Sequence, residues 1–258
     1  MSHDNEYHDN MVTMLELIWG EGYMAPGGAG NIGKLLHGTD PDGKRILDIG
    51  CGIGGPAFEM ARSHGAEVTG IDLEAPLIDR ARAAAVRHGL DDRCHFQVVD
   101  TGPLPFADAS FDIVVSSGAI TQTDDKHALL SEASRVLRPG GYMTCYEWLK
   151  SDAEISDDMR YWLRLEGLTY ALETLQQLEA RFLDAGFTEV TATDASDWYR
   201  REARREYALI KGELYERVVE LLGADAAEHF VEDWRAMTVV CDAGEMRQGY
   251  CRGRLSAL

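Results

Sequence analysis

The sequence predicts an α/β fold built around a doubly wound, mostly parallel β-sheet, and two stretches near residues 50 and 70 carry that prediction. Residues 44–49 form a short apolar run that leads into the glycine-rich segment 50–55 and then into a helix-like stretch. A second apolar run, residues 68–72, ends in an acidic residue. This order of strand, glycine turn, helix and strand is the first βαβ unit of a nucleotide-binding sheet.

The remaining segments continue the alternation of strands and helices. Segments 96–100 and 104–116 predict a third and a fourth strand, and a helix that closes at 133–141 precedes a fifth. Further helices are predicted at 9–19, 31–36, 156–166, 172–185, 195–221 and 224–240, and further strands at 187–193 and 246–255. We therefore expect a seven-stranded sheet in one domain, residues 1–258. Its expected parts are an N-terminal lid at 1–40, a cofactor-binding core at 41–150, and substrate-side helices with closing strands at 151–258.

The glycine turn and its acidic neighbours indicate the kind of cofactor. Gly50, Gly52 and Gly54 allow a tight turn and a close approach of the backbone to a ligand. Asp72 follows Gly50 by 22 positions, the separation at which a carboxylate reaches a ribose diol. The sequence therefore predicts a nucleoside-containing cofactor at this turn.

The residue before the turn distinguishes between two such cofactors. Because Gly50, Gly52 and Gly55 also satisfy G-x-G-x-x-G, the spacing alone does not exclude NAD. Asp48 argues against NAD, since its carboxylate would oppose a pyrophosphate at the helix N-terminus. The same carboxylate suits S-adenosylmethionine (SAM), which carries an ammonium and a sulfonium and no phosphate.

The composition excludes several classes of partner. The formal net charge is −19 and the pI is about 4.7, whereas nucleic-acid binding needs clustered lysine and arginine. No apolar run approaches the roughly 20 residues of a membrane span, and the first residues lack the basic start and apolar core of a signal peptide. We expect a cytoplasmic monomer or homodimer that acts on a small molecule, without nucleic-acid or membrane partners.

Neither the cysteines nor the paired acids predict a metal site. The chain has five cysteines and no C-x-x-C pair, so neither a disulfide framework nor a zinc site is expected. Cys51, inside the glycine turn, is interpreted as a small residue that lines the cofactor pocket. The pairs at 91–92, 124–125 and 157–158 would admit a magnesium site for a catechol. Each pair lies at a predicted turn or helix start, however, so we expect capping and no metal.

In this order the segments 96–100, 104–116 and 133–141 resemble those of the class I SAM-dependent methyltransferases, and the resemblance covers residues 44–149. It implies a Rossmann-like methyltransferase fold with N-terminal lid helices and helical insertions. It also implies SAM as the methyl donor and S-adenosylhomocysteine as the product. The cofactor-binding residues that we expect are Asp48, Gly50, Cys51, Gly52, Gly54, Asp72, Leu73, Asp100, Thr101 and Ser117.

Several aromatic residues fall where the lid and the strand ends should meet. They are Tyr7, Trp19, Tyr23, Tyr146, Trp148 and Tyr250. Such rings can form a cage that stabilises a cationic product by cation–π contacts. Ordinary packing of the extra helices accounts for each of them equally well, so both interpretations stay open.

The two ends of the chain resemble phosphoethanolamine N-methyltransferases. The similar segments are 6–7, 20–23, 27–28, 196–199 and 249–252. The resemblance implies catalytic roles for Tyr7, on the lid, and for Tyr146, on the fifth strand. It places Gln122 where the family has its catalytic histidine and Gly118 where it has an aspartate.

The same resemblance implies a set of substrate-binding residues. Leu168 falls where the family has a phosphate-binding arginine, whereas Tyr170 falls on a neighbouring tyrosine of that family. Arg252 falls on a C-terminal lysine that holds phosphate. The substrate-binding residues that we expect are Tyr23, Tyr146, Tyr170, Tyr250 and Arg252.

These departures leave the substrate open. An ammonium must lose a proton before it attacks, and Gln122 cannot accept that proton as a histidine would. We expect N-methylation of a small polar amine of the phosphoethanolamine type. The alternatives are a sarcosine or dimethylglycine methyltransferase that forms betaine, and an S-, O- or C-methyltransferase of a small metabolite. A non-enzymatic SAM-binding partner protein is a more distant alternative.

Overall fold

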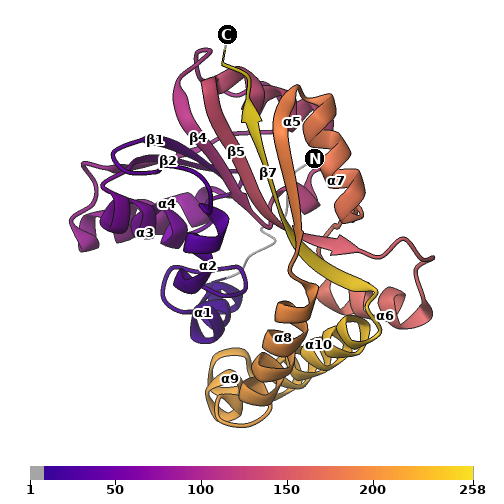
Figure 1. The fold of residues 1–258 in the computed structure, drawn as a ribbon. Helices are drawn as coiled ribbons and strands as arrows, with labels where there is room; N and C mark the ends of the chain where they lie inside the picture. The colour runs from indigo at the N-terminus through magenta and orange to yellow at the C-terminus, as the bar shows by residue number, and fades with distance from the viewer. Residues whose placement is uncertain (1–8, 258) are drawn as a thin grey trace.

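The computed structural model describes residues 9–257, whose seven strands form one sheet in the order β3-β2-β1-β4-β5-β7-β6. The pairs β1–β2, β2–β3, β1–β4 and β4–β5 are parallel, while β7 runs antiparallel to both β5 and β6. The first three strands along the chain therefore lie on one side of β4, and the last strands lie on the other (Figure 1). The predicted doubly wound fold with a mostly parallel seven-stranded sheet is confirmed.

The strands lie within a few residues of their predicted positions. They are β1 (Arg45–Ile49), β2 (Glu67–Asp72), β3 (Cys94–Val98), β4 (Phe111–Ser117), β5 (Leu137–Lys150), β6 (Phe187–Asp194) and β7 (Met246–Leu255). The helices are α1 (Asp9–Trp19), α2 (Ala29–Leu35), α3 (Gly55–His64), α4 (Ala75–His88), η1 (Ile120–Gln122), α5 (Lys126–Val136), α6 (Asp157–Glu166), α7 (Leu175–Asp184), α8 (Ser196–Ile210), α9 (Tyr215–Leu222) and α10 (Ala224–Asp242).

Helices cover both faces of the sheet, because successive strand residues point to opposite sides. On one face Ile46 and Val68 pack with side chains of α2, α3 and α4. On the other face Leu47 and Val114 pack with side chains of α5 and α7. In β1, which is buried on both faces, Ile46, Leu47 and Ile49 are therefore apolar, and Asp48 is the buried exception.

A third apolar core lies in what we call the helical cap, which consists of α1, α6, α8, α9 and α10. Its buried residues include Met14, Trp162, Tyr199 and Trp234. Figure 1 shows α6, α8, α9 and α10 together beyond the end of the sheet at which β5 finishes and β7 begins. Ligands bind beyond the carboxyl ends of the strands in this class of fold, so the cap stands over the expected site.

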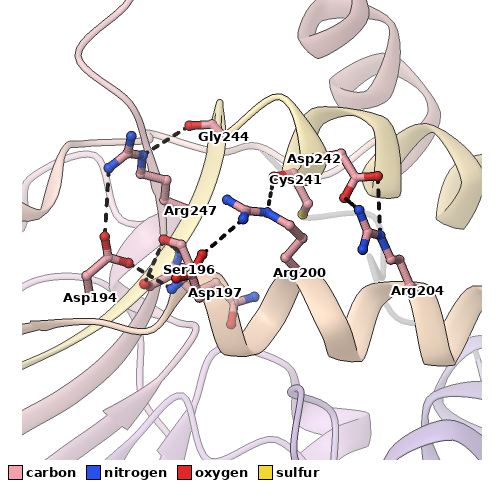
Figure 2. A network of polar contacts seen from close by, with 10 residues as sticks. Asp194, Ser196, Asp197, Arg200, Arg204, Cys241, Asp242, Gly244 and Arg247 are labelled. Carbon is pink, nitrogen blue, oxygen red and sulfur yellow. Dashed lines mark hydrogen bonds and ion pairs between the residues drawn. The ribbon is translucent and has the colours of Figure 1, made fainter.

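Polar contacts connect the cap to the start of β7 (Figure 2). The Arg200 guanidinium donates to the Cys241 carbonyl over 3.1 Å, and Arg204 pairs with Asp242 at 2.8 Å, so α8 is held along the end of α10. Arg247 donates to the Gly244 carbonyl and pairs with Asp194 at 3.8 Å. Exposed ion pairs of this kind contribute little stability singly, but together they fix how α8 enters the cap.

Two of the predicted helices differ from the structure. The predicted helix 195–221 is wrong: α8 ends at Ile210 and α9 begins at Tyr215, with Gly212 in the break. Glycine weakens a helix interior, and the break lets α9 turn back against α1. The predicted helix 172–185 begins only at Leu175, because Thr174 caps it and forms a capping box with Gln177.

Within the cap, a carboxyl pair is buried between α6 and α10. Asp233 is 6% exposed, and its pKa is raised by burial and then by the charge of Glu166. A folded-state pKa above the unfolded one means that the folded protein holds a proton that the unfolded chain releases. This contribution to stability is therefore full at low pH and is lost as the pH rises above about 4.

We predict that Asp233→Asn raises the stability of the protein at neutral and alkaline pH. Asparagine keeps the side-chain shape and is neutral without a bound proton, so folding no longer requires proton uptake. The gain should therefore grow between pH 5 and pH 8 and reach roughly 1–3 kcal/mol. Thermal unfolding across this range measures it. The matched control is Asp225→Asn, which changes an exposed residue of the same helix. An equal response of the two variants would contradict the prediction.

Candidate functional site

The glycine turn after β1 is held in close contact with neighbouring segments. Gly50 has a φ of 72°, and a Cβ at this position would lie 2.2 Å from the Cβ of Ala119. At the other end of the turn, the Gly55 N–H donates to the Gly22 carbonyl over 2.9 Å. The loop that follows α1 therefore lies directly on the turn, as expected of a lid segment beside a cofactor.

Asp48, at the end of β1, is a buried carboxylate with an unused oxygen. It is 2% exposed, and its Oδ2 has no hydrogen-bond partner among residues 9–257. Burial, and then the charge of Asp72, raise the pKa of Asp48 to about 7. An unpaired acid of this kind is costly, and a cationic ligand group would compensate it.

Asp72 connects the second strand to the glycine turn. Its Oδ2 accepts the N–H of Gly52 over 2.9 Å and its Oδ1 accepts that of Glu74 over 3.0 Å. Burial raises the pKa of Asp72, and these backbone donors partly offset the rise. Each carboxylate oxygen can accept a second hydrogen bond, so the expected bond to a ribose hydroxyl remains available.

The other expected cofactor residues lie along the same edge of the sheet. Leu73 is 45% exposed, next to Asp72. Asp100 and Thr101 are exposed just beyond β3, and Ser117 ends β4. The Cys51 thiol is buried and its pKa is raised well above the usual value, which fits a pocket lining rather than a nucleophile.

The turn after β4, which carries Gln122, is fixed by a buried acid. Glu147 is 1% exposed and accepts the N–H of Thr121 and its hydroxyl, both over 3.0 Å. The Ile120 N–H also points to this carboxylate, at 3.4 Å. Burial raises the pKa of Glu147 to about 7, although these donors and Lys126 lower it. Glu147 thus positions the turn, and its side chain lies on the face of β5 opposite to the side chains of its two sequence neighbours.

Aromatic side chains cover one face of β5 and β7. Tyr146 lies against Tyr250 with ring centroids 4.9 Å apart, and against Trp198 of α8 at 6.2 Å. Trp148, two residues further along β5, meets Tyr199 of α8 edge-on at 5.1 Å. The rings therefore form a continuous wall between the sheet and the cap.

The two tyrosine hydroxyls of this wall differ in their partners. Tyr250 donates its hydroxyl to the Asn31 Oδ1 of α2. Tyr146 is fully buried, and its hydroxyl has no partner in the described part of the chain. Burial raises the pKa of both phenols, so each is a neutral donor at physiological pH.

Tyr170 closes the wall from the segment after α6. It stacks on Trp162 with centroids 5.8 Å apart and lies 6.5 Å from Trp148. The N–H of the next residue, Ala171, donates to the Thr121 carbonyl over 2.9 Å. This hydrogen bond brings the segment of Tyr170 to the turn that carries Gln122.

Two of the expected substrate residues point elsewhere, and one cannot be placed. Arg252 donates to the His37 carbonyl, and its guanidinium lies 5.9 Å from the ring of Tyr142, near the amino-terminal half of β5. Tyr23 lies beside α3, where burial and then Glu59 raise its pKa to about 12. The expected catalytic Tyr7 lies outside the described residues.

Sequence reasoning missed several residues of this site. Glu147, Tyr199, Asn31 and Gln248 are buried near this edge, and Trp198 is partly buried. Trp198 and Tyr199 lie in segment 196–199, which carried the family resemblance but gave them no role. For Glu147 and Gln248 the sequence signal is alternation along the strand. The helices that complete the wall cannot be placed against a strand from spacing alone.

Together these residues fit SAM. An orphaned carboxylate faces the turn, glycines leave space for close backbone approach, and an acid at the end of β2 retains acceptor capacity for a ribose. Within the described part of the chain, no cluster of histidine, cysteine or acidic residues could hold a metal ion. Asp125, from one of the paired acids, caps α5 by accepting the Ala128 N–H, as predicted.

Comparisons with known proteins agree with this site. Residues 47–145 match the family model described as a methyltransferase domain. The chain is 29% identical over 245 residues to phosphoethanolamine N-methyltransferase 3 of Arabidopsis thaliana, an alignment that covers 95% of this chain and 49% of the relative. It is 32% identical over 207 residues to 27-O-demethylrifamycin SV methyltransferase of Amycolatopsis mediterranei, covering 75% of this chain and 76% of that enzyme.

Solved structures share the fold. A Haemonchus contortus phosphoethanolamine N-methyltransferase 2, solved with phosphomonomethylethanolamine and S-adenosylhomocysteine, superposes with a TM-score of 0.90 at 24% identity, covering 98% of this chain and 59% of that one. The [4+2]-cyclase SpnF superposes with a TM-score of 0.77 at 22% identity, covering 98% and 96%. The fold alone therefore does not determine the reaction.

The chain belongs to the class I SAM-dependent methyltransferases. Its relatives over nearly the whole chain are phosphoethanolamine N-methyltransferases. The chain spans about half the length of these plant relatives.

We predict that SAM binds more tightly as the pH rises through 7. The pKa of Asp48 is about 7, and the carboxylate must be ionised to pair with a cationic ligand. Between pH 6 and pH 8 the ionised fraction rises from about one tenth to about nine tenths, so affinity should rise up to roughly tenfold. Calorimetric titration at constant ionic strength measures this.

Asp48→Asn is the matched control for this titration. The variant should bind SAM weakly at both pH values and show no pH dependence beyond that of the ligand's own amine. If the pH dependence of SAM affinity is the same for the wild type and for Asp48→Asn, the role of Asp48 is refuted.

Proposed function

We propose that the chain transfers a methyl group from SAM to the nitrogen of a small polar amine of the phosphoethanolamine type. The observation that carries this proposal is the match over 95% of the chain to phosphoethanolamine N-methyltransferases, together with a preserved SAM site. Bound SAM supplies the electrophilic methyl group, and the protein orients the acceptor and excludes water.

Each part of the chain has a place in this proposal. Residues 41–150 bind SAM, residues 1–40 act as the lid, and residues 151–258 supply the substrate side. Tyr146 and Tyr170 lie on the aromatic wall, where they orient the acceptor, and Tyr7 closes over it from the lid. Arg252 is not used, since its guanidinium is engaged at His37.

Gln122 has a different role from the histidine it replaces. Its turn is held by Glu147 and by the Ala171 N–H, so its side chain is well placed for hydrogen bonding to the acceptor. Since an amide does not accept a proton at neutral pH, the amine enters unprotonated or loses its proton to water. Turnover should therefore rise with pH toward the pKa of the amine.

A second candidate is methylation of sarcosine or dimethylglycine to form betaine. It is favoured by the absence of the family's phosphate-binding arginine at Leu168 and by the position of Arg252 away from the site. A carboxylate carries less charge than a phosphate dianion and needs fewer cationic partners.

We further propose that the protein acts in the cytoplasm, as a monomer or homodimer, without nucleic-acid or membrane partners. The net charge of −19 disfavours nucleic acid and anionic lipid surfaces. None of the helices among residues 9–257 is long and apolar enough to cross a membrane.

Incubation with methyl-labelled SAM and a panel of acceptors tests the function. We expect label transfer to phosphoethanolamine or its monomethyl form, and the panel includes sarcosine, dimethylglycine, a small thiol and a catechol. Transfer to carboxylate amines alone would select the second candidate. Binding of SAM without transfer to any acceptor would refute both candidates.

We predict that Gln122→His increases turnover of phosphoethanolamine at neutral pH, by roughly 10²-fold or more if the imidazole acts as a general base. The gain should be smaller at pH 9, where more of the amine is already unprotonated. Steady-state rates at pH 7 and pH 9 measure it. Gln122→Asn, which keeps an amide, is the control and should show no gain; an equal gain with asparagine would contradict the base argument.

A further inference from the structure

A buried glutamine on β7 lies on the substrate-facing side of the sheet. Gln248 pairs across the strands with Trp148, and Tyr250 pairs with Tyr146. Residues directly opposite each other in an antiparallel pair share a face, and so do residues two apart. Gln248 therefore belongs to the same wall as Tyr146, Trp148 and Tyr250.

The amide of Gln248 is unpaired although it is fully buried. The side chain is 0% exposed, and neither Nε2 nor Oε1 has a hydrogen-bond partner among the described residues. A buried polar group without a partner costs free energy in the folded state. Because nearly all buried polar groups in folded proteins are paired, this unpaired amide needs an explanation, and ligand binding is one.

A second unpaired group stands diagonally across the strands. The Tyr146 hydroxyl is also fully buried and has no partner in the part of the chain that the structure describes. The hydroxyls of its neighbours are used, because Tyr250 donates to Asn31 and Tyr199 donates to the Met237 sulfur. Diagonal neighbours lie within reach of long side chains, so the two unpaired groups lie close together on one face of the sheet. We call the region over these two groups, beside the start of α8, the space beside Gln248.

The surroundings define what this space accepts. Its walls are the rings of Trp148, Trp198 and Tyr199, and the start of α8 closes it where the Ala195 N–H donates to the Gln248 carbonyl over 2.8 Å. Two neutral donors, Nε2 and the phenol, can bind oxygens of a carboxylate or a phosphate. The Oε1 acceptor and the aromatic faces suit an ammonium or a methylated nitrogen.

The space also adjoins the expected cofactor edge. The Gly118 N–H donates to the Tyr146 carbonyl over 2.8 Å, and a Cβ at Gly118 would lie 3.7 Å from the indole nitrogen of Trp148. The wall thus continues directly into the turn after β4. A small molecule held here would extend toward that turn.

We propose that Gln248 is a substrate-binding residue, which together with the Tyr146 hydroxyl holds the oxygen-bearing end of a small amine acceptor. This inference rests on the proposed amine methylation. It names the residues that bind the oxygen-bearing end of the acceptor, which is the end opposite to its amine.

The decisive variant is Gln248→Met, which keeps the length of the side chain and removes both hydrogen-bonding ends. Protein saturated with S-adenosylhomocysteine is titrated by calorimetry with sarcosine, dimethylglycine and phosphoethanolamine, so that binding is measured without turnover. We expect the best-bound amine to lose at least roughly tenfold in affinity. The affinity for S-adenosylhomocysteine should change less than about twofold.

Thermal unfolding distinguishes a binding role of Gln248 from a purely structural role. Replacing an unpaired buried amide by an apolar group of the same shape should raise the unfolding temperature. The matched control is Thr144→Val on β5, whose buried hydroxyl is paired with the Leu35 carbonyl at 2.7 Å. It should lower the unfolding temperature and leave amine binding unchanged.

The outcomes separate this inference from the proposed function. Amine binding by the wild type that Gln248→Met leaves unchanged would overturn the role of Gln248 and keep the proposed function. Wild-type protein that binds S-adenosylhomocysteine but none of the amines would overturn the proposed function, and this inference with it.

Discussion

The close contact at the glycine turn is the constraint on which the rest of the site depends. The carboxylate of Asp72 accepts the Gly52 N–H, and the Gly22 carbonyl, in the loop after α1, accepts the Gly55 N–H. A Cβ at Gly50 would collide with Ala119 in the turn after β4. Three segments far apart in the chain thus meet at one point, and a side chain at any of these glycines would push them apart.

Buried polar groups gather at the same edge of the sheet. Asp48, Glu147 and Gln248 are each almost inaccessible, and the described residues satisfy only Glu147. A buried acid that is fully hydrogen-bonded positions the backbone around it, whereas an unpaired one costs stability until a ligand supplies its partner. The paired and unpaired groups differ in the role that we expect of them. Glu147 positions the turn after β4, whereas Asp48 and Gln248 lie where ligands are expected to bind.

The aromatic wall explains how one scaffold can serve different acceptors. Rings of β5, β7 and α8 pack on one another and form a rigid surface that does not depend on the charge of a ligand. Selectivity then comes from the few polar groups set into the wall. Gln122 and Gln248 are the polar residues that we propose for this role.

Much of the fold was determined by the sequence alone, for a local physical reason. Strands that are buried on both faces must be apolar throughout, glycine turns need positive φ, and capped helices begin at definite residues, so β1, β2, α3 and their turn could be identified by pattern. The same locality explains the error at 195–221, where periodicity continued through Gly212 although the chain turns there. The acids Asp48 and Asp72 were recognisable because their spacing from the turn is fixed by the strands that carry them.

Only the tertiary structure decided which distant residues meet. Gln248 and Tyr146 are about a hundred residues apart, and their sharing of one space follows from the register of β5 against β7 and from the position of α8 above them. Arg252 looked equally suitable in the sequence and shares a face of β7 with Tyr250, yet it lies further along the strand, where its guanidinium donates to the His37 carbonyl. Whether a polar side chain is paired within the protein or left to bind a ligand depends on all of its spatial neighbours. It therefore cannot be predicted from the spacing of residues along the chain.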